Sequence, residues 1–565
     1  MSLFSSIQMA GNTLQIQQIG LQVAGQNMAN ASTPGYSREV MNLEAGPTQR
    51  LGGVLLGTGV QVQSIQQEVD QFLNQRVRSA TSDQTGTAVS TQTYQQLEGL
   101  FGELSNSNLG TALTDFTSSI AQVLNSPQDA PTRDLAVLKG QSLANNLNSL
   151  AQQTDQVRSN LNSQVIQDAG NINDLLTQVG KLNVQIAVTE GGNTTSSQAV
   201  GLRDQRNVAL TSLAKLMSIT TVEQPDGAIN VYNGGDYLVS EGEVRLVKVD
   251  TTSDRGLQAA NIRLAQTDSP LAISSGEVGG LTNSRDQVLG GFLDQLNAFA
   301  GTLAHEFNKI YSTGQGLNGY SQVTSTTPVS DVNAALGAAG LKNPPVNGAF
   351  QVLVYNKSTG LTQTTNVQTA ENGLVTDTSL ANLATQLNSI DGLSAATTPD
   401  GKLTISTTSA DQQVAFAGDT SGALAALGIN TFFTGSDARN IGVNSAVVQD
   451  PSTFVASSGG VGVDTNVAQQ LAQFQGLPLE SHNGATMADL YNQIAASVTQ
   501  GSSVAKSLSD GATTFVSSLQ GQQQAISGVS IDEETVNMLQ YQRNFQASAK
   551  FISTLSELLN TLVQL

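Results

Sequence analysis

The last stretch of the chain decides how the rest can fold, and from Ser530 to Leu565 it reads SIDEETVNMLQYQRNFQASAKFISTLSELLNTLVQL. Ser530 followed by Glu533 is a capping box, and the acidic first turn suits the positive end of a helix dipole. No Gly or Pro interrupts the segment, so we expect one helix about 50 Å long. Its apolar side chains recur every seven residues, which predicts a coiled-coil seam. The seam residues are Ile531, Met538, Phe545, Ile552 and Leu559, thickened by Tyr541, Leu555 and Leu562.

The beginning of the chain carries a matching seven-residue pattern, which we interpret as the partner of that seam. No charged side chain occurs before Arg38, so we expect no basic signal peptide here, and the apolar runs are too short for a transmembrane helix. A neutral polar face favours packing against copies of the same helix. The alternative is an ordinary terminal helix docked on its own domain. The repeating residues are Ile7, Leu14, Leu21 and Met28, with Leu3, Ala10 and Ala24 between them.

Short motifs beside these two helices are specific enough to indicate a family. Pro34 must end the first helix, because the residue before a proline is pushed out of the helical region. The decapeptide ANASTPGYSR at 29–38 resembles the N-terminal signature shared by flagellar rod, hook and hook-associated proteins. The segments SGVSIDEE (527–534), LQYQ (539–542) and ASAK (547–550) are similar to the C-terminal end of hook-associated members. The resemblance continues through LRDQR (202–206) and the helix near Arg285, and it fades between about residues 325 and 440.

The resemblance implies a structural subunit of the bacterial flagellum at the junction between hook and filament. Such a subunit is exported unfolded by the flagellar type III pathway and polymerises at the distal end of the hook through its terminal helices. The implied partners are further copies of the chain, the hook protein, the second hook–filament junction protein and a cytoplasmic export chaperone. The chaperone would hold the C-terminal stripe of Phe545, Ile552 and Leu559 before export. The implied location is the extracellular flagellum, after a transient cytoplasmic stage.

Composition narrows the possible functions. A chain of 565 residues allows several domains. The formal net charge of −20 argues against nucleic acid and anionic membranes, because both are bound by clustered Lys and Arg. The chain has no cysteine, so disulfides and thiolate metal sites are excluded. We therefore expect no cofactor, no nucleic-acid partner and no membrane partner.

Between its ends the chain predicts a helical rod. Apolar residues at helical spacing run from Gln66 to about Glu190 in three pieces, with Thr132 as the cap of the third. The third piece alternates three- and four-residue steps from Leu143 to Ile186. Asp168 falls in this apolar seam, where we expect a frayed or solvated point. A further helix from Ala485 to Ile526 should pack antiparallel on this rod.

Three stretches break the helical period. Gly46 to Gly59 is punctuated by glycines and predicts a short hairpin or arm. From Met217 to about Leu281 apolar and polar residues alternate between Gly-rich turns, which indicates β-hairpins. Between about 325 and 440, strand-like segments surround a helix from Ser379 to Ile390, and this pattern looks like the small α/β insert of flagellins and their caps. The predicted parts are a terminal coiled-coil domain (1–35 and 528–565), a helical rod (36–217, 281–324 and 441–527), a small β domain (218–280) and a flagellin-like α/β domain (325–440).

His305 and Glu306 are the one place where catalysis could be suspected. A zinc-protease helix needs a second His four residues after the first, and that position is Lys309. The other histidine, His482, is far along the chain. We therefore expect no catalytic or metal site, and we place His305 and Glu306 on the surface or edge of a helix.

Two classes of function remain open. One is a structural junction subunit, and the other is a secreted surface adhesin or binding module built on a coiled-coil stalk. Paired amphipathic ends with an uncharged first helix favour the structural subunit, and an enzyme is not expected. The predicted fold class is mainly α with β-rich inserts. Its domains are nested, with paired N- and C-terminal coiled-coil helices, a helical rod, and outer β and α/β domains.

Overall fold

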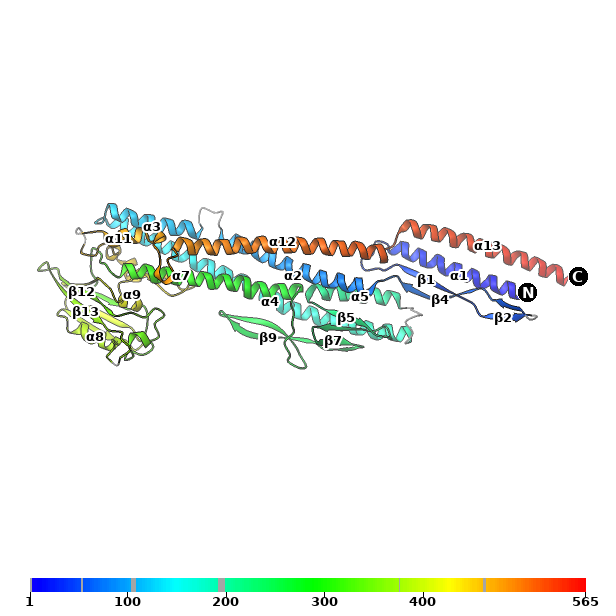
Figure 1. Ribbon diagram of the computed structural model, residues 1–565, viewed down its shortest axis with the longest axis horizontal. Coiled ribbons are helices and arrows are strands. Elements are labelled where there is room, and N and C mark those ends of the chain that lie inside the picture. Colours follow the sequence, from blue (N-terminus) through cyan, green and yellow to red (C-terminus); the bar gives the residue numbers. More distant parts are fainter. Residues whose placement is uncertain are drawn as a thin grey trace. The chain divides into compact units, whose positions relative to one another are not determined.

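The computed structural model describes residues 3–564 except 52–53, 103–107, 192–198, 375 and 461–463. Helices dominate and small antiparallel sheets interrupt them, so the fold is mainly α with β-rich inserts, as predicted (Figure 1). The chain divides into two compact units, each built from several segments. Unit 1 comprises Met1–Thr93, Ser159–Asp286 and Ser503–Leu565, and unit 2 comprises Tyr94–Arg158 and Gln287–Ser502. The four-part division into domains stays a prediction.

Long helices supply most of the chain. The terminal helices are α1 (Leu3–Asn30) and α13 (Ile531–Val563), and α1 ends before Pro34 as expected. The other long helices are α2 (Gln71–Phe101), α3 (Leu109–Asn125), α4 (Ala130–Glu190), α5 (Val200–Leu216), α7 (Gly290–Tyr311) and α12 (Met487–Ser527). Shorter ones are α6 (Gly276–Asn283), α8 (Leu380–Asn388), α9 (Ala423–Leu427), α10 (Ser445–Gln449) and α11 (Asn466–Ala472), and a π-helical turn, Ser284–Leu289, joins α6 to α7.

α4 is continuous over 61 residues, so the expectation of a frayed or solvated point at Asp168 is wrong. The Asp168 side chain is only 7% exposed, and it accepts a hydrogen bond from Asn171 Nδ2 at 3.2 Å. Burial, with the nearby Glu277 carboxylate, raises the pKa of Asp168 to about 6. The prediction that Thr132 caps α4 is also wrong. Asp129 caps the helix by accepting the Thr132 N–H at 3.2 Å, and Thr132 lies inside the first turn.

α12 runs antiparallel to α2, where we expected it to pack on α4. Gln523 donates a hydrogen bond to Asn74, and Thr91 Oγ1 donates to the Ala505 carbonyl at 3.0 Å. Residue numbers therefore rise in opposite directions along the two helices, and Figure 1 shows the same antiparallel course. The apolar core between the two helices consists of Leu73, Val77, Ala80, Val516 and Leu519.

An extended arm follows α1. Its strands β1 (Glu39–Ala45) and β4 (Val60–Gln67) pair antiparallel, and β2 (Thr48–Leu51) pairs with β3 (Val54–Gly57) beyond them. This is the hairpin expected around the glycine-punctuated stretch, although β4 extends over Gln66 and Gln67, where we expected helix to begin.

The β insert of unit 1 lies between α5 and α6. One antiparallel sheet contains β5 to β8 in sequence order, and β9 pairs with β10 in a separate ribbon. These strands match the predicted hairpins. They are β5 (Thr220–Glu223), β6 (Ile229–Asn233), β7 (Asp236–Ser240), β8 (Glu243–Val244), β9 (Val247–Asp254) and β10 (Leu257–Leu264).

Three asparagines attach this insert to α4. In Asn162, Asn173 and Asn183 the side-chain oxygen accepts a strand N–H while the nitrogen donates to a strand carbonyl, at 2.7–3.1 Å. Successive asparagines are about three helical turns apart, so their amides lie on one side of the helix. α4 therefore holds strands by polar contacts. The strand groups are those of Gln258 and Ala260, Val247, and Ile229.

Unit 2 contains an α/β insert between α7 and α10. One sheet has the order β13 (Leu361–Thr369), β12 (Gly348–Asn356), β16 (Gln412–Ala417), and another has the order β11 (Gln322–Thr324), β15 (Leu403–Thr407), β14 (Leu393–Thr397). β17 (Phe433–Thr434) pairs with β18 (Gly442–Val443). The buried residues of this insert form one core from Tyr320 to Ile429, to which α8 contributes three fully buried leucines.

An aromatic cluster stands apart from that core. Phe432 and Phe433 lie with ring centroids 4.8 Å apart, and Phe116 of α3 and Phe307 of α7 pack within 5.2–5.6 Å of both. Asn308 holds the strand in place by accepting the N–H groups of both phenylalanines at 3.0 and 2.9 Å. Residues 432–433 therefore pack with helices rather than with the sheets of the insert.

Candidate assembly surface

The first turn of α13 is capped by the residue that the sequence indicates. Ser530 Oγ accepts the N–H of Glu533 at 3.4 Å, and Asp532, Glu533 and Glu534 occupy the first turn. The Glu533 carboxylate does not complete the capping box, because it lies 3.2 Å from Arg38 Nη1 instead. The ion pair with Arg38 thus replaces the hydrogen bond that Glu533 would accept in a complete capping box.

α1 and α13 lie side by side and antiparallel, as Figure 1 shows for the blue and red helices. The Tyr541 ring covers Gly20 so closely that a Cβ built on Gly20 would lie 2.8 Å from it. Nearer the start of α13, the Thr535 hydroxyl lies 3.8 Å from the Met28 sulfur. A glycine at the contact lets the two backbones approach, and the aromatic ring fills the space.

The predicted interface residues are distributed over this pair. They are neither all buried nor all exposed in the single chain, and the side chain of Leu3 lies outside the described residues. Their role in assembly therefore stays a prediction. Half-buried are Ile7, Leu14, Leu21, Met28, Met538, Tyr541, Ile552 and Leu559; Leu555 is buried; and Ile531, Phe545 and Leu562 are exposed.

The residues that α1 buries most deeply include two that we did not assign. Ile16 and Val23 are 6% and 8% exposed, beside the small residues Ala10 and Ala24. α1 is covered on two sides, by α13 and by strands β1 and β4 of the arm. Ile16 and Val23 are also seven residues apart, so a second stripe was visible in the sequence.

Part of α13 presents apolar side chains to solvent. Phe551, Leu558 and Leu562 are 46%, 51% and 60% exposed, and their spacing of seven and four residues places them in one row. We call these three residues the outer stripe. An exposed row of large apolar side chains on a helix marks a surface for another protein segment.

Arg38 links the two ends of the chain. Its Nε donates to Glu534 Oε1 at 2.9 Å, and Nη1 lies 3.2 Å from Glu533 and 3.6 Å from Glu68. Its backbone N–H donates to the Ser527 carbonyl at 2.9 Å. The Glu534 side chain is 4% exposed, so this carboxylate depends on Arg38 for its charge compensation.

Tyr36 of the decapeptide and Glu39, just after it, both bind Asn27 of α1. Asn27 is fully buried, and its amide group exchanges two hydrogen bonds with the backbone of Glu39, at 2.9 and 3.0 Å. The Tyr36 hydroxyl donates to the same Asn27 oxygen at 2.7 Å. Burial raises the pKa of Glu39 and, with Glu39 nearby, that of Tyr36. The turn after α1 therefore has a single geometry.

The LRDQR segment (202–206) of α5 binds residues of the arm that follows α1. Asp204 Oδ1 accepts the Ser37 N–H at 3.2 Å and the Gln67 side-chain amide at 2.6 Å. Burial raises the pKa of Asp204 to about 7, against the lowering effect of its hydrogen bonds from Ser37 and Gln67. α5 thus holds both the beginning of the arm and its return strand.

Comparisons with known proteins show what this chain is similar to. The family model described as the flagellar hook-associated protein FlgK helical domain matches residues 94–324, and the flagellar basal body rod FlgEFG protein C-terminal model matches residues 522–565. Flagellar hook-associated protein 1 of Salmonella typhimurium is 24% identical over 578 residues, covering 99% of this chain and 100% of that protein. The Escherichia coli K12 protein of the same name is 24% identical over 588 residues, with the same coverage. Over nearly its whole length this chain is similar to flagellar hook-associated protein 1.

Other relatives are more distant or partial. Flagellar hook-associated protein 1 of Bacillus subtilis is 28% identical over 257 residues, or 44% of this chain and 49% of that protein. The solved structure of the flagellar hook junction protein FlgK from Burkholderia pseudomallei aligns at 16% identity with a TM-score of 0.49, over 80% of this chain and 100% of that one. The resemblance inferred from the terminal motifs is confirmed by the whole-length matches.

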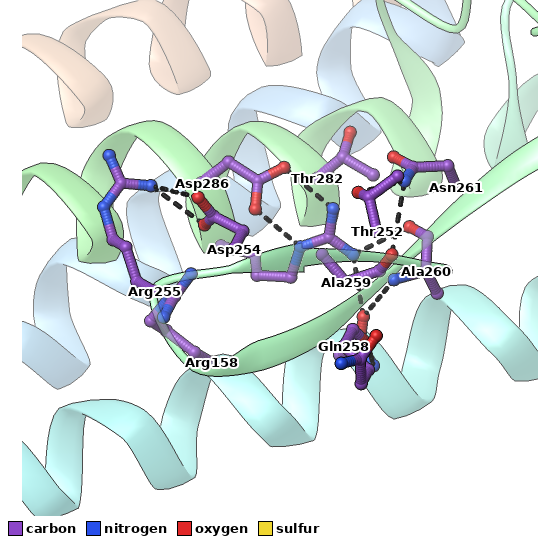
Figure 2. Close-up of polar contacts among 12 residues, drawn as sticks. Arg158, Thr252, Asp254, Arg255, Gln258, Ala259, Ala260, Asn261, Thr282 and Asp286 are labelled. Atoms are coloured by element: carbon purple, nitrogen blue, oxygen red, sulfur yellow. Dashed lines mark hydrogen bonds and ion pairs between the residues drawn. The ribbon is translucent and has the colours of Figure 1, made fainter. Parts of the chain in front are cut away.

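Arg285 lies within the residues that match the FlgK helical domain. Its side chain is fully buried and binds Asp286 through two hydrogen bonds of 2.7 and 2.8 Å. Its Nη1 donates to the Ala260 carbonyl and to Asn162 Oδ1, both at 2.8 Å. Figure 2 shows the surrounding contacts, with Asp286 and Ala260 labelled. This arginine joins α4, β10 and the π-helical turn, and it is structural.

Glu306 is not where we expected it, whereas His305 lies at the edge of its helix. Glu306 is 7% exposed rather than on the surface, and it accepts a hydrogen bond from Ser481 Oγ at 2.6 Å. The same hydroxyl lies 2.8 Å from His482 Nδ1. His305 is half-buried, and burial lowers its pKa. No three His, Cys, Asp or Glu side chains in the described part of the chain are grouped to hold a metal ion.

Within the described ranges, no helix combines the length and the apolar character needed to cross a bilayer.

Proposed function

We propose that the chain is a structural subunit of the bacterial flagellum, located at the junction between hook and filament. The observation that carries the proposal is the outer stripe on α13, beside a helix face that already packs on α1. Covering such side chains stabilises by roughly 1.5–3 kcal/mol each, which favours association with further copies. The similarity to flagellar hook-associated protein 1 supports the location.

The terminal helices would then form the assembly interface. The half-buried seam residues hold α1 against α13, while Ile531, Phe545 and Leu562 contact neighbouring copies. The exposed side of α1 carries glutamines and asparagines without any charge, so like charges do not oppose close packing in a ring or helical array.

The partners follow from this location. They are further copies of the chain, the hook protein, the second hook–filament junction protein and, before export, a cytoplasmic chaperone bound to the C-terminal helix. The chain would pass unfolded through the export channel, and it would act in the extracellular flagellum without a cofactor or enzymatic activity.

We further predict that both ends are largely disordered in the isolated monomer and fold on assembly. Ordering a residue costs roughly 1–2 kcal/mol for the backbone alone, and one helix pair with exposed apolar rows buries little to offset it. Hydrogen exchange on purified monomer should be near random-coil rates in residues 5–30 and 535–562 and slow in 143–186. Strong protection of both ends in a verified monomer would contradict this prediction.

The assembly test uses strains that lack the native gene and carry variants of this chain. Phe551→Ser with Leu558→Ser removes two members of the outer stripe, which should weaken association by more than about 100-fold. Electron microscopy should then show hooks without filaments. Ser553→Asp changes an exposed polar residue of the same helix and should leave filament number unchanged. Normal filaments in the double variant would refute the role of this surface.

A further inference from the structure

Three arginines of unit 1 line one small cavity. Arg78 comes from α2, and Arg203 and Arg206 come from α5. Thr221 and Glu223 of β5 close it on the side of the β insert, and its volume is about 30 Å³. A wider cavity of about 280 Å³ shares Arg203 and Glu223 with it. The small cavity therefore has a route through which a solute can enter.

Two of the guanidinium groups have unused donors there. Arg78 and Arg206 are 6% and 2% exposed, and the Nε atom of each has no hydrogen-bond partner among the described residues. Their hydrogen bonds go to neutral groups: Arg78 Nη2 donates to Thr221 Oγ1 at 2.8 Å, and Arg206 Nη1 donates to the Gly227 carbonyl at 2.6 Å and to Asn183 Oδ1 at 3.0 Å. A buried N–H without an acceptor is costly, so both atoms are suited to a ligand that accepts hydrogen bonds.

The charges around the cavity do not balance. Arg203 forms ion pairs with both nearby carboxylates. Its Nε lies 2.7 Å from Glu190 Oε1, and its Nη1 lies 2.5 Å from Glu223 Oε1. Glu223 is 4.0 Å from Arg206, and Arg78 has no carboxylate within ion-pair distance in the described part of the chain. Three guanidinium groups thus face two carboxylates, and one buried positive charge remains.

Burial and neighbouring charges also disfavour the charged forms of Arg78 and Arg206. Burial lowers the pKa of Arg78 to about 10. Burial and the neighbouring Arg203 lower the pKa of Arg206 to about 10, with a further contribution from Arg78, although Glu223 and Glu190 oppose the shift. Asp204 does not supply the missing charge, because it is engaged by Ser37 and Gln67 and does not line the cavity.

We propose that this cavity binds one small monovalent anion, of the size and charge of chloride, between the guanidinium groups of Arg78 and Arg206. The anion accepts the two free Nε–H donors and offsets the remaining positive charge. A volume of about 30 Å³ is more than one water molecule needs, so an ion of halide size fits there. Because the lining comes from α2, α5 and β5, the bound anion stabilises the packing of these elements.

The test follows unfolding of the full chain at constant ionic strength while sodium gluconate is replaced by sodium chloride. Specific binding raises the unfolding midpoint by a few degrees and then saturates. Arg78→Gln should abolish this dependence. Arg76→Gln removes the same charge from an exposed position of α2 and should preserve it. A midpoint that does not respond to chloride, or an equal response in Arg78→Gln, overturns the proposal.

A crystal of the unmodified chain soaked in sodium bromide gives a second readout that does not depend on a variant folding. The expected result is an anomalous peak between the Arg78 and Arg206 Nε atoms. Ordered water at that position without an anomalous peak overturns the proposal.

Discussion

Charged side chains are scarce in this protein, and several of them act inside it. Arg133, Arg158, Arg206 and Arg285 are among its largest fully buried side chains. Three donate to backbone carbonyls of other segments: Arg133 to Phe454, Arg206 to Gly227 and Arg285 to Ala260. A guanidinium has five donors in a fixed plane, so one residue can bind carbonyls that no secondary structure satisfies. These arginines join segments that are distant in the sequence.

Arg38 is the residue on which the start of α13 depends. Arg38→Gln should leave the Glu534 carboxylate buried without compensation, at a cost of about 3 kcal/mol in the local stability of α13. Hydrogen exchange of amides 534–545 in assembled protein should then accelerate by about 100-fold. Arg543→Gln removes a charge from the exposed side of the same helix and serves as the control. Equal exchange rates in the two variants would contradict the link.

Asp168 makes stability depend on pH. Its pKa is about 6 in the folded chain, against an unfolded value near 4, so its stabilising effect is complete below about pH 4 and is lost as pH rises through about 6. Asp168→Asn should therefore reduce, by up to about 3 kcal/mol, the fall in unfolding free energy between pH 4 and 7. Denaturant titrations at several pH values measure this. Asp174→Asn, on the exposed side of α4, should keep the wild-type slope.

Among the secondary-structure elements, α1 and α13 fit closely against each other. Their contact depends on a glycine under an aromatic ring, and their outer faces differ: α1 presents uncharged polar groups and α13 presents an apolar row. In such a pair, apolar side chains are covered between the two helices but stay exposed on the outer face of α13. We propose that the pair acts as a repeating unit, in which each copy covers what the previous copy exposes.

Gly20→Leu tests that contact. A side chain there would displace the Tyr541 ring and separate the helices, so we expect a loss of about 1–3 kcal/mol in their pairing. Gly11→Leu adds the same group to the same helix at a position where a Cβ meets nothing within 4 Å, and it should be neutral or stabilising. Filament counts by electron microscopy compare the two. Equal counts would show that the close approach is dispensable.

At the scale of the whole molecule, both compact units combine segments that are distant in the chain. Each unit carries its own β-rich insert, attached by side chains of the helices. In unit 1 the asparagines of α4 attach the insert. In unit 2 the aromatic cluster, which includes Phe116 of α3, lies outside the core of the α/β insert. The position of that cluster decides where the insert can be removed.

Excision of residues 321–429 with a short Gly-Ser joiner should leave helicity and cooperative melting of the remainder largely intact. Excision of 321–440 should not, because it also removes Phe432 and Phe433, which pack on Phe116 and Phe307. Circular dichroism and thermal unfolding of the two deletions distinguish them. Equal loss of cooperativity in both would show that the insert and the helices fold as one.

The sequence by itself determined most of the elements and the resemblance to hook-associated proteins. Heptad spacing, the Ser530 cap, Pro34 and the change of period near Met217 are local signals, because helix and strand patterns depend on neighbours within a few residues. They sufficed for α1, α4, α12, α13 and the β-hairpins. The terminal motifs sufficed for the relationship to hook-associated proteins.

Only the tertiary structure decided which faces meet and which polar groups are buried. The partner of α12 and the burial of Asp168 and Glu306 all depend on segments that no local pattern brings together. Arg38 and Glu534, which form one ion pair, are 496 residues apart. A side chain's burial is a property of what packs against it, so the periodicity of one helix can predict a face but not the occupant of that face.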